Sequence, residues 1–476
     1  MDNVRAVAGD ASRTDNAGGS FDTSAVGAIS PTLMRVAEFV LQMRPDLPPD
    51  AARERAAYLL LDTLGICIAS APMDAGVIAR KTASLLYAGS EPQYSARMLF
   101  DGRRVSLAGA AFAAATQTDN LDGHDGYNPT KGHIGVVAMP ALAALAEAGA
   151  DLSGPEALTA LIVCYEVAGR AGIALHASVS DYHTSGAWNG LGVAAMAARL
   201  RQHSKAMLRE GLGIAEYHGP RSQMMREIAT PTMLHDGSGW GALAGLTAAV
   251  LAEQGFTGAP AVTVEHPDIA LHWQDLGSFW QIEKQYVKPY PTCRWGHAAI
   301  DAVWDLRQQH LIKPEDVAEV RVKSFHYAVT LFQGIPDTTS KAQYSLSFAV
   351  AVMLAHGRIG LEHISGGGLK DKVVAALVAR TTVTEEPRHQ ARFPAGRWAD
   401  VDLVLKDGRV LSSGDTHARG GPERPFTGDD IVAKFMDFAS PVIGKPRAER
   451  IRDAVLRLNR PTSRFSDLAA HLYDPP

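Results

Sequence analysis

One stretch of the sequence, from Thr118 to His133, gathers many of the side chains that could do acid–base chemistry. Its glycines and proline break both helix and strand periodicity, so the stretch is predicted to be a loop. An alanine-rich helix is expected before it (Ser106 to Thr118) and an apolar helix after it, beginning near Val136. Titratable residues between two buried elements indicate a functional site, and the alternative is a charged surface loop. These residues are Asp119, Asp122, His124, Asp125, Tyr127, Lys131 and His133.

A second segment, KPYPTCRWGH, begins at Lys288, and its two prolines keep it extended and rigid. Arg294 can bind a carboxylate through two parallel hydrogen bonds, and Lys288 can add a point charge. The alternative for these two cations is a solvated surface pair. His297 stands at the start of a predicted helix, as a capping residue or a proton carrier. Tyr290 and Cys293 are candidates for substrate contact, although Cys293 could also be a small buried filler.

Two further histidines, His183 and His235, lie on loops that precede helices rich in alanine and glycine. Small residues let a ligand approach the N-terminus of a helix, where free N–H groups and the positive end of the dipole attract carboxylates. Several such helix ends could converge on one anion. Each histidine either makes structural hydrogen bonds or belongs to the site.

These residue types together favour proton transfer on a small carboxylate. Arginine, lysine and helix ends would hold the substrate, while a histidine or lysine removes a proton from the carbon next to a carboxylate or carbonyl group. The resulting anion can eliminate a leaving group, lose carbon dioxide or regain the proton on its other face. The same residues therefore suit a dehydratase, a decarboxylase or an epimerase, and their spacing does not separate the three.

Other kinds of chemistry have weaker support in the sequence. His124, Asp125 and His133 could ligate zinc, but their spacing matches no metal motif, and the sequence contains neither HExxH nor CxxC. It also lacks a Walker loop, a GxSxG elbow and a GxGxxG loop after a predicted strand. We therefore expect neither a metal nor another cofactor.

Composition limits the class of protein. Hydrophobic residues make up 46% of the sequence and charged residues 20%, which is typical of a soluble globular protein. A length of 476 residues predicts two domains. The formal net charge of -5 argues against a nucleic-acid or anionic-membrane partner. Three cysteines are too few for a disulfide framework and fit the cytoplasm. The lack of a long apolar run or a secretory signal predicts no membrane span, and residues 1–27 are expected to be a disordered tail.

Hydrophobic periodicity predicts a mainly α protein, with a large all-helical domain and a smaller α+β domain, which is called the lid domain below. The helices expected in the first domain, besides the two that flank the loop, are Pro31–Met43, Asp50–Ala69, Pro155–Leu175, Gly190–Leu200, Ser204–Tyr217 and Trp240–Gln254. The second domain is expected to contain a strand at Phe279–Tyr290, a helix from His297, a strand at Val317–Val329, a helix at Ser340–Leu354 and a hairpin around Asp407–Gly408. The expected boundaries are 28–278 for the helical domain, 279–424 for the lid and 425–476 for C-terminal helices that return to the helical domain.

Six segments carry a family resemblance: YLLLDTLGICIAS from Tyr58, GHIGVVAMPALAALAEA from Gly132, YEVAGR from Tyr165, GWGALAGLTAAVLAEQGFTG from Gly239, KPYPTCRWGHAAIDA from Lys288 and KAQYSLSFAVAVML from Lys341. Together they resemble the MmgE/PrpD family over residues 32–458. Members of that family include 2-methylcitrate dehydratase, cis-aconitate decarboxylase and iminodisuccinate epimerase. The resemblance implies a homodimer that does cofactor-free acid–base chemistry on di- or tricarboxylates in the cleft between the helical domain and the lid.

The resemblance also implies roles for single residues. Asp119 is similar to the family's active-site aspartate, and His133 to the histidine before the small-residue helix. His183 resembles the histidine ahead of the glycine-rich helix, and Lys288 the lysine at the entrance to the lid. Cys293 falls where decarboxylases that resemble this family place a histidine.

Two departures from the family pattern bear on the reaction. Many members have an Asp-Phe-Asp-Asp-Thr run, whereas this chain has DNLDGH from Asp119 and a few extra residues that include Lys131. Many members also have a lysine shortly before the Gly239 helix, where this chain offers Thr232, Met233 and then His235. Lys131 and His235 are candidates to replace the missing groups.

We therefore expect a cofactor-independent lyase of the dehydratase type that acts on a small di- or tricarboxylate. An epimerase of an amino- or iminodicarboxylate such as iminodisuccinate is the alternative, and a cis-aconitate-type decarboxylase or a non-catalytic dicarboxylate binder is less favoured. The candidate catalytic residues are Asp119, Lys131, His133, His183 and His297. The candidate substrate-binding residues are His124, His235, Lys288, Tyr290, Cys293 and Arg294.

Overall fold

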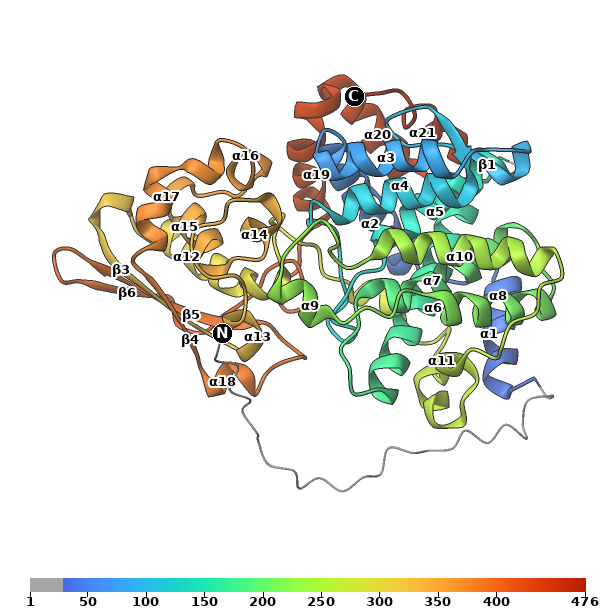
Figure 1. Cartoon of the computed structure of the whole chain (residues 1–476), viewed down its shortest axis with the longest axis horizontal. Helices are drawn as coiled ribbons and strands as arrows, with labels where there is room; N and C mark the ends of the chain where they lie inside the picture. Colours follow the sequence, from blue (N-terminus) through green and yellow to red (C-terminus); the bar gives the residue numbers. More distant parts are fainter. Residues whose placement is uncertain (1–28, 150) are drawn as a thin grey trace, which may run out of the picture.

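The computed structural model describes residues 29–149 and 151–476, in which a large helical part lies beside a smaller part built around a sheet (Figure 1). This mainly helical fold with a small mixed sheet near the C-terminal end confirms the predicted fold class. The predicted tail at residues 1–27 lies outside the described residues.

The helical part contains the eight helices expected from periodicity, with closely matching ranges, and also α3, α9 and α11, which periodicity did not predict. They are α1 (Pro31–Gln42), α2 (Asp50–Ser70), α3 (Asp74–Leu86), α4 (Leu107–Asp119), α5 (Gly135–Ala148), α6 (Gly154–Ser178), α7 (Asn189–Leu200), α8 (Lys205–His218), α9 (Met224–Ala229), α10 (Ser238–Glu253) and α11 (Val262–Glu265). A two-stranded antiparallel ribbon accompanies them, formed by β1 (Ser95–Arg97) and β2 (Arg104–Ser106).

Local signals set the helix ends that surround the predicted loop. Ser106 caps α4, because its Oγ accepts a hydrogen bond from the N–H of Gly109 (3.1 Å). Ahead of α10, Gly237 has a φ of +67°, a conformation that favours glycine, and it turns the chain into the helix. The C-terminus of α4 and the N-termini of α5 and α10 therefore all meet the loop.

Helix α2 is buried continuously from Leu59 to Ser70, which confirms the prediction that it is central to a core. Helix α19 (Gly428–Ile443) packs on it so closely that a Cβ at Gly65 would lie 3.1 Å from the ring of Phe435. In the same contact, Lys434 Nζ donates to Asp62 Oδ1 (2.5 Å) and to the carbonyl oxygen of Gly123 in the loop (2.7 Å). The C-terminal helices α19, α20 (Lys445–Arg457) and α21 (Phe465–Ala469) thus lie against the helical part (Figure 1).

Helix α6 is long and apolar enough to cross a membrane by length and composition, but 94% of its apolar window is buried inside the protein. Helices α2 and α3 pass the same test only as a pair, with a bend of 91° between them. Within α6, Arg170 and Glu166 form a buried ion pair (2.5 Å). Its apolar residues therefore pack in the core of the helical part.

The lid contains a five-stranded mixed sheet in the order β4-β3-β5-β6, with β7 paired to β5. Strands β3 and β4 are parallel, and the other pairs are antiparallel. Helix α12 packs on β5, and α15 packs on α12. The strands are β3 (Val317–Ser324), β4 (Thr381–Glu385), β5 (Trp398–Leu405), β6 (Val410–Ser412) and β7 (Thr416–His417). The helices are α12 (His297–Gln309), α13 (His326–Val329), α14 (Thr339–Gln343), α15 (Leu346–His356), α16 (Leu361–Ile364), α17 (Lys372–Val378) and α18 (Pro387–Gln390).

The predicted hairpin is confirmed, since β5 and β6 pair across a turn in which Gly408 has a φ of +89°. The strand predicted at Phe279–Tyr290 is wrong. Its centre is a single helical turn, Gln281–Lys284, because the buried Glu166 carboxylate accepts the backbone N–H of Ile282 (3.0 Å). A pattern of alternating apolar residues cannot reveal a partner 116 residues away.

Two other predicted elements are divided. The strand from Val317 ends at Ser324, and helix α13 follows it. The helix predicted at Ser340–Leu354 breaks into α14 and α15, because the Ser345 side chain caps a new helix by accepting the N–H of Phe348 (3.4 Å). The break turns Tyr344 toward the interface with the helical part.

The Lys434–Asp62 pair gives a test of how α19 is held. Lys434→Met should lower the free energy of unfolding by about 3–5 kcal/mol, because it leaves a buried carboxylate unpaired. The double variant Asp62→Leu/Lys434→Met should recover most of that loss. Denaturant unfolding measures both, and Lys445→Met, at an exposed site on α20, is the control. Equal stability of Lys434→Met and the control would contradict this account.

Candidate active site

The loop between α4 and α5 is buried, which rules out the alternative of a charged surface loop. The side chains with acid–base capacity are at most 6% exposed, apart from Lys131, which is partly exposed. The buried set is Asp119, Asp122, His124, Asp125, Tyr127 and His133. So many polar groups in an interior require partners, and those partners fix the geometry of the site.

Asp125 is the centre of this arrangement. Its backbone carbonyl accepts a hydrogen bond from Nδ1 of His133 (2.7 Å) and also faces Nδ1 of His124 (3.3 Å). Its carboxyl group accepts a hydrogen bond from the hydroxyl of Tyr165 (3.1 Å) and lies at the first turn of α5. There, a Cβ on Gly135 would be 2.0 Å from Asp125 Oδ1. Burial raises the pKa of Asp125 to about 7.

The other ring nitrogen of His133 faces a second carboxyl group. Nε2 lies 3.3 Å from Asp236 Oδ2, while Asp236 Oδ1 accepts the N–H (3.2 Å) and the hydroxyl (3.1 Å) of Ser185. Burial raises the pKa of Asp236 to about 7. Burial and the nearby Lys288 hold the pKa of His133 well below its usual range.

These contacts define the protonation state of the pair. A carbonyl oxygen can only accept, so His133 carries its proton on Nδ1 and its Nε2 has a free lone pair. Asp236 Oδ2 faces Nε2 at 3.3 Å, and burial of this carboxyl group favours its protonated form. The pair thus combines a neutral imidazole, whose Nε2 is unprotonated, with a carboxyl group that titrates near neutral pH.

Asp119 is a further buried acid of the site and contacts α10 and His124. Its Oδ2 accepts the backbone N–H of Ser238 at the start of α10 (3.0 Å), and its Oδ1 is 3.4 Å from Nε2 of His124. Burial raises the pKa of Asp119 to about 7. Asp119 and His235 face a neighbouring cavity of about 700 Å³ on the helical part. Burial lowers the pKa of His235 to about 3, so His235 is a neutral group.

A small cavity of about 20 Å³ lies where the loop meets the lid, and five predicted residues line it: Lys131, His133, Lys288, Cys293 and Arg294. The structure therefore brings the loop and the KPYPTCRWGH segment together. The remaining lining residues are Asp122, Tyr182, Met224, Asp236, Tyr286, Trp295, Tyr344 and Arg397.

Two lining residues have contacts that define their charge states. Lys288 Nζ makes an ion pair with Asp122 and also donates to the Asp122 carbonyl (3.1 Å), so its charge is already neutralised. Cys293 is a neutral thiol, because burial raises its pKa to about 12. Its N–H donates to the carbonyl of Gln343 (2.8 Å). Cys293 therefore contributes shape to the cavity and has no thiolate at neutral pH.

Six of the candidate residues do not line this cavity: Asp119, His124 and His235, whose positions are given above, and Tyr290, His297 and His183. Tyr290 donates to Asp301 (2.8 Å) and lines a separate cavity between the lid and α19. His297 is fully buried at the start of α12, with Nε2 2.9 Å from the carbonyl of Thr292. His183 lies in a backbone bridge with Gln223. Nδ1 of His183 and Nδ1 of His297 are buried without a hydrogen-bond partner among the described residues.

Sequence reasoning missed several of the lining residues. Asp236 follows the candidate His235 directly, so its position next to a histidine was the available signal. Tyr344 was hidden inside a predicted helix, and Arg397 lies after Pro394 in a lid segment without a motif. Tyr182 and Tyr286 carry no signal beyond their residue type.

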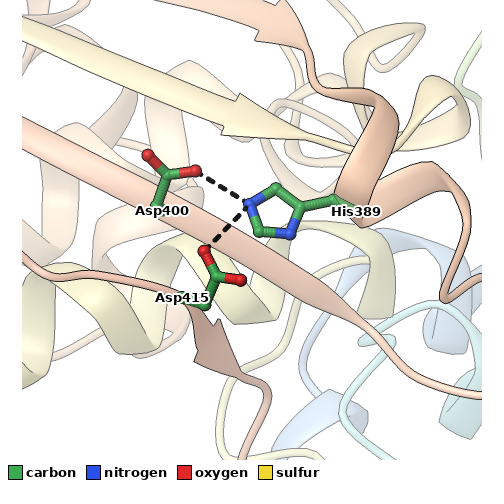
Figure 2. Close-up of side chains that lie close together, drawn as sticks. All are labelled: His389, Asp400 and Asp415. Carbon is green, nitrogen blue, oxygen red and sulfur yellow. Dashed lines mark hydrogen bonds and ion pairs between the residues drawn. The ribbon is translucent and has the colours of Figure 1, made fainter.

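A group of His389, Asp400 and Asp415 lies in the lid, away from this cavity (Figure 2). Figure 2 shows the His389 ring between the two carboxylates. Its Nε2 lies 2.8 Å from Asp400 Oδ1 and 4.0 Å from Asp415 Oδ1. Cationic side chains already neutralise both acids: Arg388 contacts each of them, and Arg392 is 2.8 Å from Asp415. The group is a salt-bridge network and is poorly suited to a metal ion.

The fold and the site define an enzyme with an acid–base pair and several cations between a helical domain and a lid. Residues 34–275 match the MmgE/PrpD N-terminal domain and residues 290–460 match the MmgE/PrpD C-terminal domain. The chain belongs to the MmgE/PrpD family, whose enzymes act on small carboxylates.

Two curated relatives are similar over most of their length. A cis-aconitate decarboxylase of Mus musculus is 26% identical over 379 residues, which cover 73% of this chain and 75% of the relative. A cis-aconitate decarboxylase of Aspergillus terreus is 24% identical over 468 residues, which cover 88% of this chain and 91% of the relative.

The raised pKa of Asp236 predicts how the free energy of unfolding depends on pH. Asp236 has a pKa raised from 3.8 to about 7, so its contribution to stability is complete in acid and is lost as the pH rises toward 7. Asp236→Asn mimics the protonated acid and does not titrate. As the pH rises from about 4 to about 7, the free energy of unfolding of the variant should therefore increase by about 1–3 kcal/mol relative to that of the native chain.

Denaturant unfolding at several pH values measures this gain. Glu315→Gln, at an exposed position in the lid, should show no such trend. A stability difference between Asp236→Asn and the native chain that stays constant with pH would show that Asp236 is ionised throughout.

Proposed function

We propose that the protein is a cofactor-independent lyase of the dehydratase type that acts on a small polycarboxylate. The observation that carries the proposal is the His133–Asp236 pair, in which a neutral imidazole with a free Nε2 faces a cavity lined by cations. A base in that position suits removal of a proton from a carbon next to a carboxylate. The cations would stabilise the negative charge that then develops on the carboxylate oxygens.

The two members of the pair supply both proton transfers of a dehydration. His133 Nε2 takes the proton from carbon, and the electron pair of the broken C–H bond forms the double bond. The neighbouring C–O bond breaks, and the departing hydroxyl takes the proton of Asp236 and leaves as water. The imidazolium then returns one proton to the Asp236 carboxylate, which restores the starting state.

Access to the cavity requires a change of shape. A volume of about 20 Å³ holds about one water molecule, which is far too little for a polycarboxylate. The lining side chains come from both the helical part and the lid. We infer that the lid moves away from the helical part to admit substrate and closes over it, as lids commonly do in enzymes that exclude water.

The other outcomes remain alternatives for the same residues. Epimerisation of an amino- or iminodicarboxylate needs a second base on the opposite face, and Lys131 is the candidate, because burial lowers its pKa. Decarboxylation is the activity in the names of the relatives. It is less favoured here because Cys293, a neutral thiol with a pKa of about 12, occupies the position expected to hold a histidine in decarboxylases.

We also propose that the enzyme is a cytoplasmic homodimer. The three cysteines are free, as expected for a reducing compartment. Exposed apolar side chains gather at Leu85 and Leu86 of α3 and at Met233, Leu234 and Trp240 beside α10. Such patches often mark subunit interfaces. Light scattering distinguishes a dimer from a monomer.

The reaction can be tested with hydroxylated di- and tricarboxylates in deuterated water. The expected product is an alkene, detected by its ultraviolet absorbance and by mass spectrometry. His133→Asn can still donate to the Asp125 carbonyl but lacks Nε2, so kcat should fall by about 10²- to 10⁴-fold with little change in Tm. His310→Asn, at an exposed site in the lid, is the control.

Three outcomes would contradict the proposal. Deuterium uptake without an alkene would indicate an epimerase, and release of carbon dioxide would indicate a decarboxylase. A normal kcat for His133→Asn would remove His133 from the reaction.

A further inference from the structure

The cavity of about 700 Å³ that Asp119 and His235 face differs in chemical character from the small cavity beside His133. It lies on the helical part, between the C-terminal half of α4, helix α9 and the first turn of α10. Its volume is within the range of about 300–1,000 Å³ that is typical of sites for small organic ligands. The apolar part of its lining consists of Phe112, Pro220, Ala229, Met233, Leu234 and Trp240.

The charged groups of this large cavity disfavour an anion. Asp119 and Glu227 line it as buried acids, and burial raises the pKa of each to about 7. The Glu227 carboxyl group already accepts the N–H of Thr232 (2.8 Å). Arg226, the one cation that lines the cavity among the described residues, is exposed. An uncharged, apolar group therefore suits the large cavity. The small cavity is different, because it is lined by Lys131, Lys288, Arg294 and Arg397.

A wall one residue thick separates the two cavities. Gln223 lines the large cavity, and the next residue, Met224, lines the small one. His235 and Asp236 are divided between the two cavities in the same way. The His235 ring also packs against the ring of Tyr344, which lines the small cavity, with 5.5 Å between the ring centres. A ligand that occupies both cavities therefore has to displace only side chains of this wall.

His235 is held in the wall by packing and not by hydrogen bonds of its side chain. It is 2% exposed, and neither ring nitrogen has a hydrogen-bond partner among the described residues. Its φ of +45° lies in the left-handed region, which is uncommon for a residue with a side chain and occurs often at functional sites. Tyr344 belongs to the lid, so the lid movement inferred above would remove the ring on which His235 packs. Rotation of the His235 side chain would then break no hydrogen bond and would join the two cavities.

Unpaired polar groups in the large cavity indicate that a ligand reaches it. Buried polar atoms in proteins normally have hydrogen-bond partners, because an unpaired one costs free energy. Besides His235, the hydroxyl of Thr184 lines the cavity and is buried without a partner in the described part of the chain. A ligand with an oxygen atom beside its apolar part would supply partners for both residues.

We propose that the substrate carries an apolar substituent several carbon atoms long, which lies in the large cavity while its acidic end reaches His133 in the small one. The inference rests on the proposed function, which places proton transfer in the small cavity, and it adds the feature that selects among acids. Phe112 and Trp240 form the aromatic side of the site, with their rings edge to face at 5.4 Å. They determine specificity, and an acid without a substituent is a weaker ligand.

Calorimetric titration of the native protein with succinate, 2-butylsuccinate and 2-octylsuccinate tests the inference, since none of the three has a hydroxyl group to eliminate. The Kd should fall along this series by up to about fourfold for each methylene group that is buried. 2-Octylsuccinate should also displace succinate. Ala229→Trp, at an exposed position of α9, fills the cavity and should raise the Kd for 2-octylsuccinate about tenfold or more without changing that for succinate. Leu311→Trp, at an exposed apolar position of the lid, is the control.

Trp240→Ala, at a half-exposed position, should also raise the Kd for 2-octylsuccinate, because it removes apolar contact area. Thermal unfolding checks that both variants fold. Equal Kd values along the series, or an unchanged Kd for 2-octylsuccinate in both variants, would overturn this inference alone if alkene formation is normal. Binding of 2-octylsuccinate that leaves succinate in place would also overturn it, since the cavity would then hold a separate apolar ligand. Failure of the dehydratase assay would contradict the proposed function and leave these affinities as predicted.

Discussion

The hydrogen bond from His133 Nδ1 to the backbone carbonyl of Asp125 is the contact on which the site depends. It fixes the tautomer of the imidazole and so leaves Nε2 as the atom that faces Asp236 and the cavity. The bond is maintained because the Asp125 carboxyl is itself anchored by Tyr165 and by the first turn of α5. Gly135 is required there, since any Cβ would displace that carboxyl.

The charges around this contact follow from burial in an interface between two parts of the chain. Desolvation raises the pKa of Asp119, Asp125 and Asp236 to about 7 and holds the pKa of His133 well below its usual range, so the carboxyl groups titrate near neutral pH while the imidazole is neutral there. The cations behave differently, because a guanidinium group cannot lose its proton in a protein. The lining of the cavity therefore carries more cationic than acidic side chains.

Much of the fold and part of the site could be predicted from sequence. Glycine and proline identified the loop, and helical periodicity located α4, α5 and α10 around it. The wrong strand at Phe279–Tyr290 and the missed Asp236, Arg397 and Tyr344 share one cause. Their positions depend on contacts across more than a hundred residues or on a helix cap such as Ser345, and one sequence does not reveal these. Lys288 was correctly expected near the site, but its ion pair with Asp122 could be seen only in three dimensions.

The central claim is that His133 is a neutral imidazole protonated on Nδ1. Nitrogen NMR of histidine-labelled protein, with His133→Asn used to assign the signal, measures this directly because the two ring nitrogens have different shifts in each tautomer. The account predicts a proton on Nδ1, an unprotonated Nε2 and no titration of the ring near pH 6.5, the usual value for histidine. A proton on Nε2 in the neutral ring, or an imidazolium at neutral pH, would contradict it.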